Sequence, residues 1–212
     1  MIREVRHPVF ARVYERFAGS AEKAGAAQHR DTLLADLHGR VAEIGAGNGL
    51  NFAHYPNTVT EAVAVEPEPY LRARAADAAR HTAVKVTVLD GTADKIPLPD
   101  ASVDAAVASL VLCSVADQSA ALAELHRVIR PGGDLRFYEH VAADHPKWIR
   151  RQKRYDPVWS WFAGGCHLTR RTEDAIEAAG FQIDSCERFL FQPCVVAKLA
   201  APHILGRARR LP

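Results

Sequence analysis

The stretch Val41-Ala-Glu-Ile-Gly-Ala-Gly-Asn-Gly-Leu50 decides the fold of this 212-residue chain. A short β-prone run leads into three glycines at alternate positions, Gly45, Gly47 and Gly49. Glycine tolerates positive φ and lets the backbone approach a ligand closely. A strand that runs into such a loop, with a helix after it, directs free N–H groups at an anionic or polar ligand. The stretch therefore predicts a nucleoside-binding loop at the end of a strand.

The composition is that of an ordinary soluble globular protein, with 48% hydrophobic and 25% charged residues. Lys+Arg total 27 and Asp+Glu total 25, so the net charge of +2 gives no reason to expect a nucleic-acid partner. No apolar run reaches membrane-spanning length, and the N-terminus lacks the apolar core of a signal peptide. We therefore expect a cytoplasmic location.

The cysteines show no Cys-x-x-Cys spacing; they are Cys113, Cys166, Cys186 and Cys194. In a cytoplasmic protein this pattern indicates reduced thiols rather than disulfides or a zinc site. We therefore expect no metal.

The rest of the chain alternates strand and helix patterns. Further strands are expected over residues 61–66, 84–89, 104–112 and 134–139, and helices over 69–81 and 118–129. The run 104–112 is almost continuously apolar, as is typical of a strand buried on both faces of a parallel sheet. Repeated βαβ units predict an α/β fold with a doubly wound, mostly parallel, seven-stranded sheet.

Two segments interrupt this alternation. Residues 1–38 have helical apolar spacing and are expected to form an N-terminal helical cap. Residues 141–168 contain all three tryptophans with interleaved Lys and Arg, and form an aromatic-rich insertion after the fifth strand. We expect this insertion to be a lid and acceptor wall within a single domain, 1–212. Plain packing of an amphipathic helix, or weak contact with an anionic membrane surface or RNA, remain as alternatives.

The C-terminal part predicts one helix and two closing strands. Thr169 or Thr172 is expected to cap the helix, with Gly180 after its end. The closing strands are expected over 181–191 and 195–199, and the arginines near the C-terminus are read as a frayed basic tail, Arg207 to Arg210.

The glycine spacing separates several nucleotide-binding motifs. A dinucleotide fingerprint needs Gly or Ala where this chain has Leu50, and no Lys-Ser/Thr pair of a P-loop follows the glycines. Glu43-x-Gly45-x-Gly47-x-Gly49 resembles the first motif of class I S-adenosylmethionine-dependent methyltransferases. Glu66 ends the second strand, where a carboxylate can accept hydrogen bonds from both ribose hydroxyls.

The resemblance extends over roughly residues 41–140. The stretch 91–104 is similar to the family's adenine-binding segment, and 127–135 to its turn before the fifth strand. Thr92 stands where the family commonly has an acid, so either Thr92 or Asp90 is left to hold the adenine amine. The resemblance implies S-adenosylmethionine as cofactor, S-adenosylhomocysteine as product, and a binding set of Tyr14, Glu43, Gly45, Ala46, Gly47, Gly49, Asn51, Glu66, Pro67, Thr92, Ala93 and Ser109.

Three segments outside these motifs carry a narrower resemblance: Leu110–Val115, Tyr138–Val141 and Gly164–Arg170. With His54-Tyr-Pro56, they resemble the methyltransferase-like subfamily that includes small-molecule thiol S-methyltransferases. This implies methyl transfer to a small lipophilic acceptor, with a thiol as first choice and a phospholipid head group, quinol or phenol as alternatives. RNA or protein methylation and a non-catalytic cofactor-binding regulatory domain are further alternatives.

Two histidines are candidate bases for the acceptor. His140 is expected at the end of the fifth strand, where ligands of parallel sheets bind. His167 lies in the Gly-Cys-His segment and is the second candidate. Cys113 and Cys166 are expected to be buried and inert.

Overall fold

The computed structural model describes residue 15 and residues 18–212. The strands are β1 Gly39–Ile44, β2 Val59–Val65, β3 Val86–Leu89, β4 Val103–Ser109, β5 Ile129–His140, β6 Phe181–Leu190 and β7 Pro202–Arg210. The helices are η1 Glu22–Ala26, α2 Ala27–Leu34, η2 Phe52–His54, α3 Pro69–Ala79, α4 Gln118–Val128, α5 Pro146–Phe162, α6 Thr172–Ala178 and η3 Val195–Ala200. Residues 1–14 and 16–17 of the expected N-terminal helical cap lie outside the described residues.

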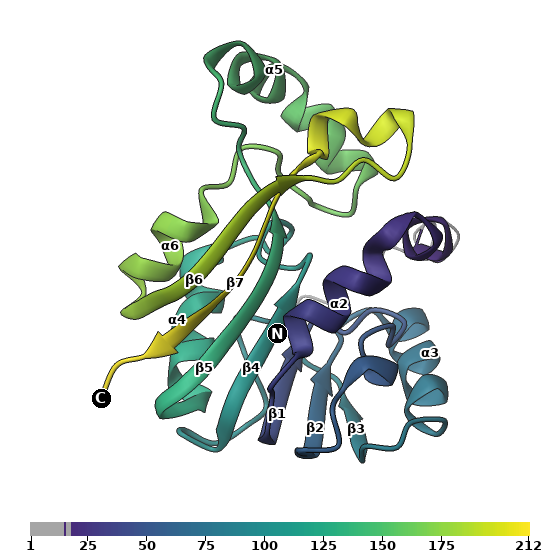
Figure 1. The fold of residues 1–212 in the computed structure, drawn as a ribbon, viewed down its shortest axis with the longest axis vertical. Coiled ribbons are helices and arrows are strands. Elements are labelled where there is room, and N and C mark those ends of the chain that lie inside the picture. The colour runs from purple at the N-terminus through teal and green to yellow at the C-terminus, as the bar shows by residue number, and fades with distance from the viewer. Residues whose placement is uncertain (1–14, 16–17) are drawn as a thin grey trace.

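One seven-stranded sheet, in the order β3-β2-β1-β4-β5-β7-β6, runs through the molecule (Figure 1). Strands β1 to β5 are parallel, and β7 is antiparallel to both β5 and β6. The predicted doubly wound, mostly parallel sheet is confirmed. The carboxyl ends of β1, β2, β4 and β5 consequently meet at one edge, which is where ligands bind in open α/β sheets.

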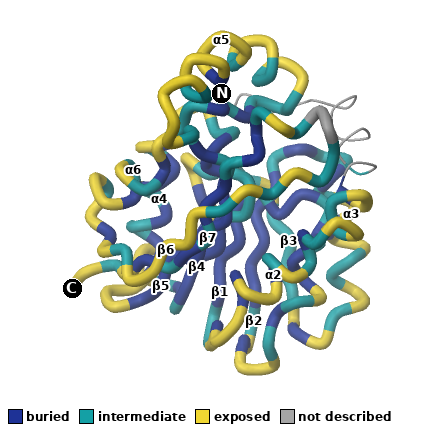
Figure 2. Tube along the Cα trace, turned by 45° about the horizontal axis from the view of Figure 1, so that its top comes forward, coloured by how far each residue is buried: buried dark blue, intermediate teal, exposed yellow. Residues whose placement is uncertain are grey.

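Helices cover both faces of the sheet. Helices α4 and α6 bury Leu122, Leu125 and Ile176 against one face. Helices α2 and α3 bury Leu33 and Ala75 against the other. The central strands are buried on both sides (Figure 2), which explains why their sequences read as continuous apolar runs.

Strand β7 corrects two predictions for the C-terminus. Residues 195–199 form part of the 3₁₀-helix η3 rather than a strand. The expected basic tail is instead the second half of β7, which pairs with β5 and β6 along its length. Its arginines are held by acids on the neighbouring strands: Arg207 pairs with Asp134, and Arg209 with Asp184.

Smaller differences concern element ends. Strand β5 already begins at Ile129 and takes in the Pro-Gly-Gly turn that was expected to precede it. The residues after the glycine loop form only a single 3₁₀ turn, because Pro56 follows so closely. Helix α6 has no side-chain cap from either threonine; the Thr172 hydroxyl instead accepts a hydrogen bond from Gln118 Nε2 at 3.1 Å.

The insertion after β5 consists mainly of helix α5, which lies beyond the end of the sheet (Figure 1). Gln152 is its one buried residue and binds the ends of other segments, donating to Val141 O and Leu199 O and accepting from Ala143 N. Large apolar side chains near its C-terminal end are exposed, with Trp161 at 78%. Among the helices of residue 15 and residues 18–212, none is both long and apolar enough to cross a bilayer.

Candidate active site

The glycine loop follows β1 directly and is held in a left-handed conformation. The φ angles of Gly45, Gly47 and Gly49 are 58°, 58° and 82°, a region that L side chains rarely adopt. A Cβ atom on Gly45 would lie 2.5 Å from Val111 Cγ2, and one on Gly49 would lie 2.7 Å from Phe52. The loop therefore needs glycine both for its conformation and for close approach to the segment after β4.

Glu66 lies against this loop from the end of β2. Its Oε2 accepts a hydrogen bond from Gly47 N at 2.7 Å, and its Oε1 accepts one from Glu68 N at 2.9 Å. Each carboxylate oxygen can accept two hydrogen bonds, so both retain capacity for the two hydroxyls of a ribose. Burial raises the pKa of Glu66 to about 7.

Glu43 is engaged within the protein. Its carboxylate accepts hydrogen bonds from Asn51 Nδ2 at 2.9 Å and from the Tyr55 hydroxyl at 2.6 Å. Asn51 Oδ1 in turn accepts a bond from Arg30, a buried cation on α2. Burial raises the pKa of Glu43 to about 7. The side-chain partners of Glu43 and Asn51 are other residues of the protein, so these two residues orient the glycine loop. Glu66, which accepts a hydrogen bond from the loop's backbone, is then the acid expected to contact the ligand.

The residues predicted to contact the adenine lie in the segment after β3. Thr92 and Lys95 form a tight turn, closed by the bond from Lys95 N to Thr92 O, and Ala93 lies within it. Asp90 pairs with Arg72 at 3.0 Å and its side chain is 74% exposed. Arg72 also donates to Pro67 O at 2.9 Å. Asp90 is thus already paired with Arg72 and largely exposed, which favours Thr92 and Ala93 over Asp90 as the contact.

Two buried polar atoms near the glycine loop lack a partner among the described residues. They are Asn48 Oδ1 in the loop and Ser109 Oγ at the end of β4. Buried polar groups are almost always hydrogen-bonded in native proteins. A polar ligand bound at the glycine loop could supply the hydrogen bonds that these two atoms lack. Ala46 is buried in the same loop, whereas Tyr14 lies outside the described residues.

Glu139, near the end of β5, lies in the segment Tyr138–Val141 but was not among the predicted site residues. It is fully buried, and its carboxylate accepts hydrogen bonds from three successive backbone N–H groups, those of Val111, Leu112 and Cys113, at 2.9, 2.8 and 3.0 Å. Burial holds the pKa of Glu139 well above its usual range. The acid at the end of β5 therefore fixes the loop after β4, the same loop that packs on Gly45.

His140 faces two thiols. Its Nδ1 lies 3.7 Å from Cys113 Sγ and 3.5 Å from Cys166 Sγ. Both cysteines are buried, as expected, and His140 is half-buried. The neighbouring Cys166 thiol, together with burial, raises the pKa of Cys113. The ring of His203 lies 4.4 Å from that of His140 on the other side, and burial lowers the pKa of His203 to about 3.

His167 is held differently. Its Nδ1 lies 2.8 Å from Asp156 Oδ2 on α5, and its side chain is 40% exposed. The backbone N–H of His167 donates to Cys113 O at 2.8 Å. An imidazole oriented by a carboxylate keeps one defined ring nitrogen free. The two candidate bases thus lie on segments that touch, but only His140 faces the thiols directly.

Sequence reasoning missed the partners that hold these groups. Those partners are Tyr55, Asp156 and Glu139, each of them buried or half-buried. Glu139 directly follows the buried aromatic residues Phe137 and Tyr138, and this was a usable signal, because acids are rarely buried without a partner. Nothing in the sequence indicated that Asp156 would meet His167.

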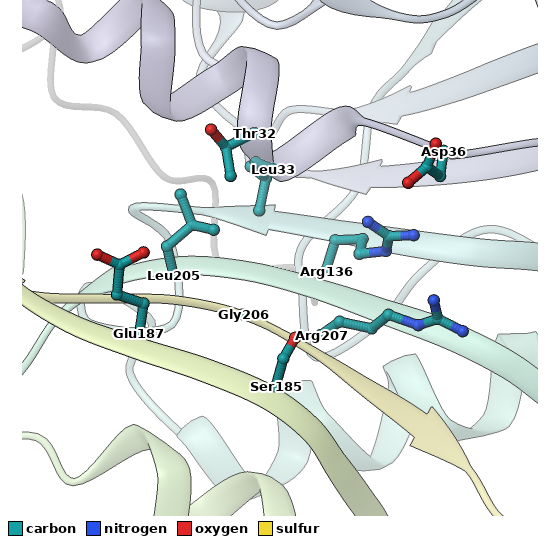
Figure 3. Close-up of a pocket in the computed structure, with 9 residues that line it drawn as sticks. All are labelled: Thr32, Leu33, Asp36, Arg136, Ser185, Glu187, Leu205, Gly206 and Arg207. Carbon is teal, nitrogen blue, oxygen red and sulfur yellow. The ribbon is translucent and has the colours of Figure 1, made fainter.

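A separate hollow of about 320 Å³ lies between the end of α2 and the strands β5, β6 and β7 (Figure 3). Asp36, Arg136 and Arg207 line part of it. It contains none of the residues predicted at the cofactor or the acceptor, so it is distinct from the candidate site.

The fold and the glycine-loop site define an S-adenosylmethionine-dependent methyltransferase. Residues 42–137 match the family described as a methyltransferase domain. The chain is 36% identical over 182 residues to thiol S-methyltransferase TMT1B of Homo sapiens, which covers 82% of this chain and 73% of that protein. It is 35% identical to human thiol S-methyltransferase TMT1A over 78% of this chain and 68% of that protein. The chain therefore belongs to this methyltransferase family.

Solved structures share the fold. An S-adenosylmethionine-dependent methyltransferase of Thermotoga maritima, described as a possible histamine N-methyltransferase, has a TM-score of 0.72 at 24% identity, covering 95% of this chain and 96% of that one. A geranyl diphosphate methyltransferase has a TM-score of 0.70 at 14% identity, covering 88% of this chain and 78% of that one. At these identities the likeness concerns the fold alone.

Proposed function

We propose that this enzyme methylates the sulfur of a small lipophilic thiol. The observation that carries the proposal is that three sequence segments converge at one edge of the sheet. Leu110 N donates to Tyr138 O at 2.7 Å, His167 N donates to Cys113 O, and His140 lies between Cys113 and Cys166. These are the segments, 110–115, 138–141 and 164–170, in which the chain resembles thiol-methylating enzymes, and its relatives above carry that name.

The cofactor site of the proposal is the glycine loop with its neighbours. Glu66 accepts hydrogen bonds from the ribose hydroxyls, and Thr92 and Ala93 contact the adenine. The unpaired side-chain oxygens of Ser109 and Asn48 form hydrogen bonds with the methionine part. S-adenosylmethionine supplies an electrophilic methyl group on a sulfonium. The protein's contribution is mainly alignment, since a well-oriented near-attack geometry is worth roughly 7–11 kcal/mol of barrier.

The acceptor side needs only a modest base. A cysteine-like thiol has a pKa near 8.5, so a useful fraction ionises near neutral pH without strong help. His140, facing the buried thiols, and His167, oriented by Asp156, are the two groups in the converged segments that can take a proton. We assign the half-exposed His167 the exchange of that proton with solvent.

Helix α5 forms the outer wall of this site in the proposal. It runs from the end of β5 to the turn that carries Cys166 and His167, so its position sets theirs. Its exposed end presents Val158, Trp161 and Phe162. An apolar surface next to the acceptor segments favours a lipophilic acceptor over a highly charged one.

The test is a panel assay with labelled S-adenosylmethionine and four acceptor classes: alkyl and aryl thiols, a quinol, a phenol, and phosphatidylethanolamine vesicles. We expect label in the thioether product. The variant Glu66→Ala should lose methyl transfer, because Glu66 is proposed to hold the ribose of the cofactor. Transfer to the lipid head group or the quinol with none to any thiol would reject the thiol assignment.

A further inference from the structure

Cys113, Cys166 and His140 bring three soft or borderline ligand atoms together from distant parts of the chain. Their two sulfurs and one imidazole nitrogen all lie within 4.8 Å of one another. Cys113 lies in the loop after β4, His140 ends β5, and Cys166 follows α5. Two thiols and an imidazole are a ligand set typical of zinc, and three protein ligands leave a fourth position open, as in catalytic zinc sites.

The distances match a tetrahedral ion. With zinc–sulfur bonds of about 2.3 Å and a zinc–nitrogen bond of about 2.05 Å, tetrahedral geometry places sulfur and nitrogen roughly 3.6 Å apart. The observed separations from His140 Nδ1 are 3.7 Å to Cys113 Sγ and 3.5 Å to Cys166 Sγ. These two separations match the tetrahedral value, and the two sulfurs lie within 4.8 Å of each other.

Contacts with neighbouring segments fix the backbone at Cys113 and next to Cys166. Cys113 is fixed at its N–H by Glu139 and at its carbonyl by His167 N. Gly165, next to Cys166, has a φ of 90°, and a Cβ atom there would lie 2.8 Å from Ser114 O. The turn after α5 can approach the loop after β4 this closely only because residue 165 is glycine. The three ligands are thus pre-positioned by contacts that do not depend on the thiols themselves.

Charge and location also fit. A divalent ion with two thiolates and a neutral imidazole is a neutral unit, which avoids the cost of burying an unpaired charge. Two residues before Cys113, Val111 packs on Gly45 of the glycine loop. The ligand cluster therefore lies next to the loop that we propose holds the cofactor.

We propose that Cys113, Cys166 and His140 bind a zinc ion whose open fourth position takes the sulfur of the acceptor thiol. The catalytic part of this inference rests on the proposed thiol acceptor; the metal site itself does not. It replaces the sequence-based expectation of no metal, which relied on the lack of a Cys-x-x-Cys motif and could not anticipate ligands 27 and 26 residues apart along the chain.

The chemical step balances without a further reactant. The acceptor thiol loses its proton as its sulfur binds zinc, because a coordinated thiol is deprotonated. With His140 bound to the ion, His167 alone passes this proton to solvent. An electron pair of that sulfur forms the bond to the methyl carbon. The bond from this carbon to the sulfonium sulfur breaks, and its pair stays on S-adenosylhomocysteine. The methyl thioether leaves, and zinc and its three protein ligands are unchanged.

The experiment measures metal on the full chain, purified under reducing conditions and dialysed with zinc. We expect about one zinc ion per chain in the wild type, and its loss in Cys113→Ser and Cys166→Ser. Cys186→Ser is the matched control, because Cys186 is an exposed thiol on β6. Calorimetric binding of S-adenosylhomocysteine by each variant shows that it is folded.

Cobalt substitution of the wild type gives a readout that needs no variant. Two thiolate ligands and tetrahedral geometry predict sulfur-to-cobalt charge-transfer absorption together with intense d–d bands. Wild-type protein that retains no zinc and shows no such bands, or that contains a Cys113–Cys166 disulfide under reductant, would overturn the site.

The two proposals fail separately. Stoichiometric zinc without methyl transfer to any thiol supports the metal site and overturns the thiol acceptor. Thiol methylation at an undiminished rate by zinc-free protein supports the proposed function and overturns the metal's part in it. A rate that falls with removal of zinc and returns on its addition supports both.

Discussion

Replacing Glu139 tests whether one buried carboxylate holds the loop between the cofactor and acceptor sides. Its three hydrogen bonds go to the successive N–H groups of residues 111–113. Each buried donor left unpaired costs about 1–3 kcal/mol, so Glu139→Ala removes about 3 kcal/mol at the lower end of that range. The lower end applies because burial raises the pKa of Glu139, and the variant no longer has to bury that carboxyl group. For a domain of this size, we expect a fall in Tm of about 6–12 °C.

Urea unfolding and amide hydrogen exchange measure this effect. We expect the amides of Val111, Leu112 and Cys113 to exchange much faster in Glu139→Ala, and Glu139→Gln to lose less stability because its carbonyl still accepts. Glu177→Gln, a change at an exposed position on α6, should alter the unfolding free energy by less than about 0.5 kcal/mol. If Glu139→Ala unfolds within that same margin of the wild type and its loop amides stay protected, the carboxylate does not hold the loop.

Two further predictions concern the glycine loop. Burial raises the pKa of Glu66 from 4.5 to about 7. Its contribution to stability is therefore full below about pH 4.5 and is lost as pH rises through 7. Because the ribose needs the ionised carboxylate, S-adenosylhomocysteine binding should tighten over that same rise in pH. Calorimetry at pH values on either side of 7 checks this, and equal pH dependence in Glu66→Gln would contradict it. Gly45→Ala should weaken cofactor binding at least tenfold, because it adds both left-handed strain and contact with Val111. Gly132→Ala, also at positive φ but near the start of β5 with nothing within 4 Å, is the control and should leave cofactor binding unchanged; an equal loss of binding in both variants would contradict a local effect at the glycine loop.

The parallel part of the sheet could be predicted because its strands are buried on both faces and read as apolar runs. Strand β7 could not, because its outward positions are arginines and its sequence resembles a solvated tail. The period-2 signal was nevertheless present: Ile204, Gly206 and Ala208 are buried on alternate positions. Only the acids supplied by β5 and β6 make arginines at the intervening positions favourable, and these partners are distant in sequence.

The cofactor motif is local, and the acceptor site is not. Glu43 and the three glycines fall within seven residues, so the resemblance to the family's first motif could single them out as predicted cofactor residues. The individual partners of Glu43 were missed, since the bonds from Tyr55 and Asn51 depend on how the chain turns at η2. Residue spacing can predict a ligand site that is built from one loop, but it says little about a site at which several distant loops meet.

The contacts of the loop after β4 explain why acceptor chemistry and cofactor binding should be coupled. Val111 packs on Gly45, Glu139 holds residues 111–113, and the carbonyl of Cys113 receives the N–H of His167. Movement of α5 therefore acts on the cofactor loop through only a few backbone contacts. We therefore expect an acceptor that shifts the 164–168 turn to shift Val111 against Gly45 as well.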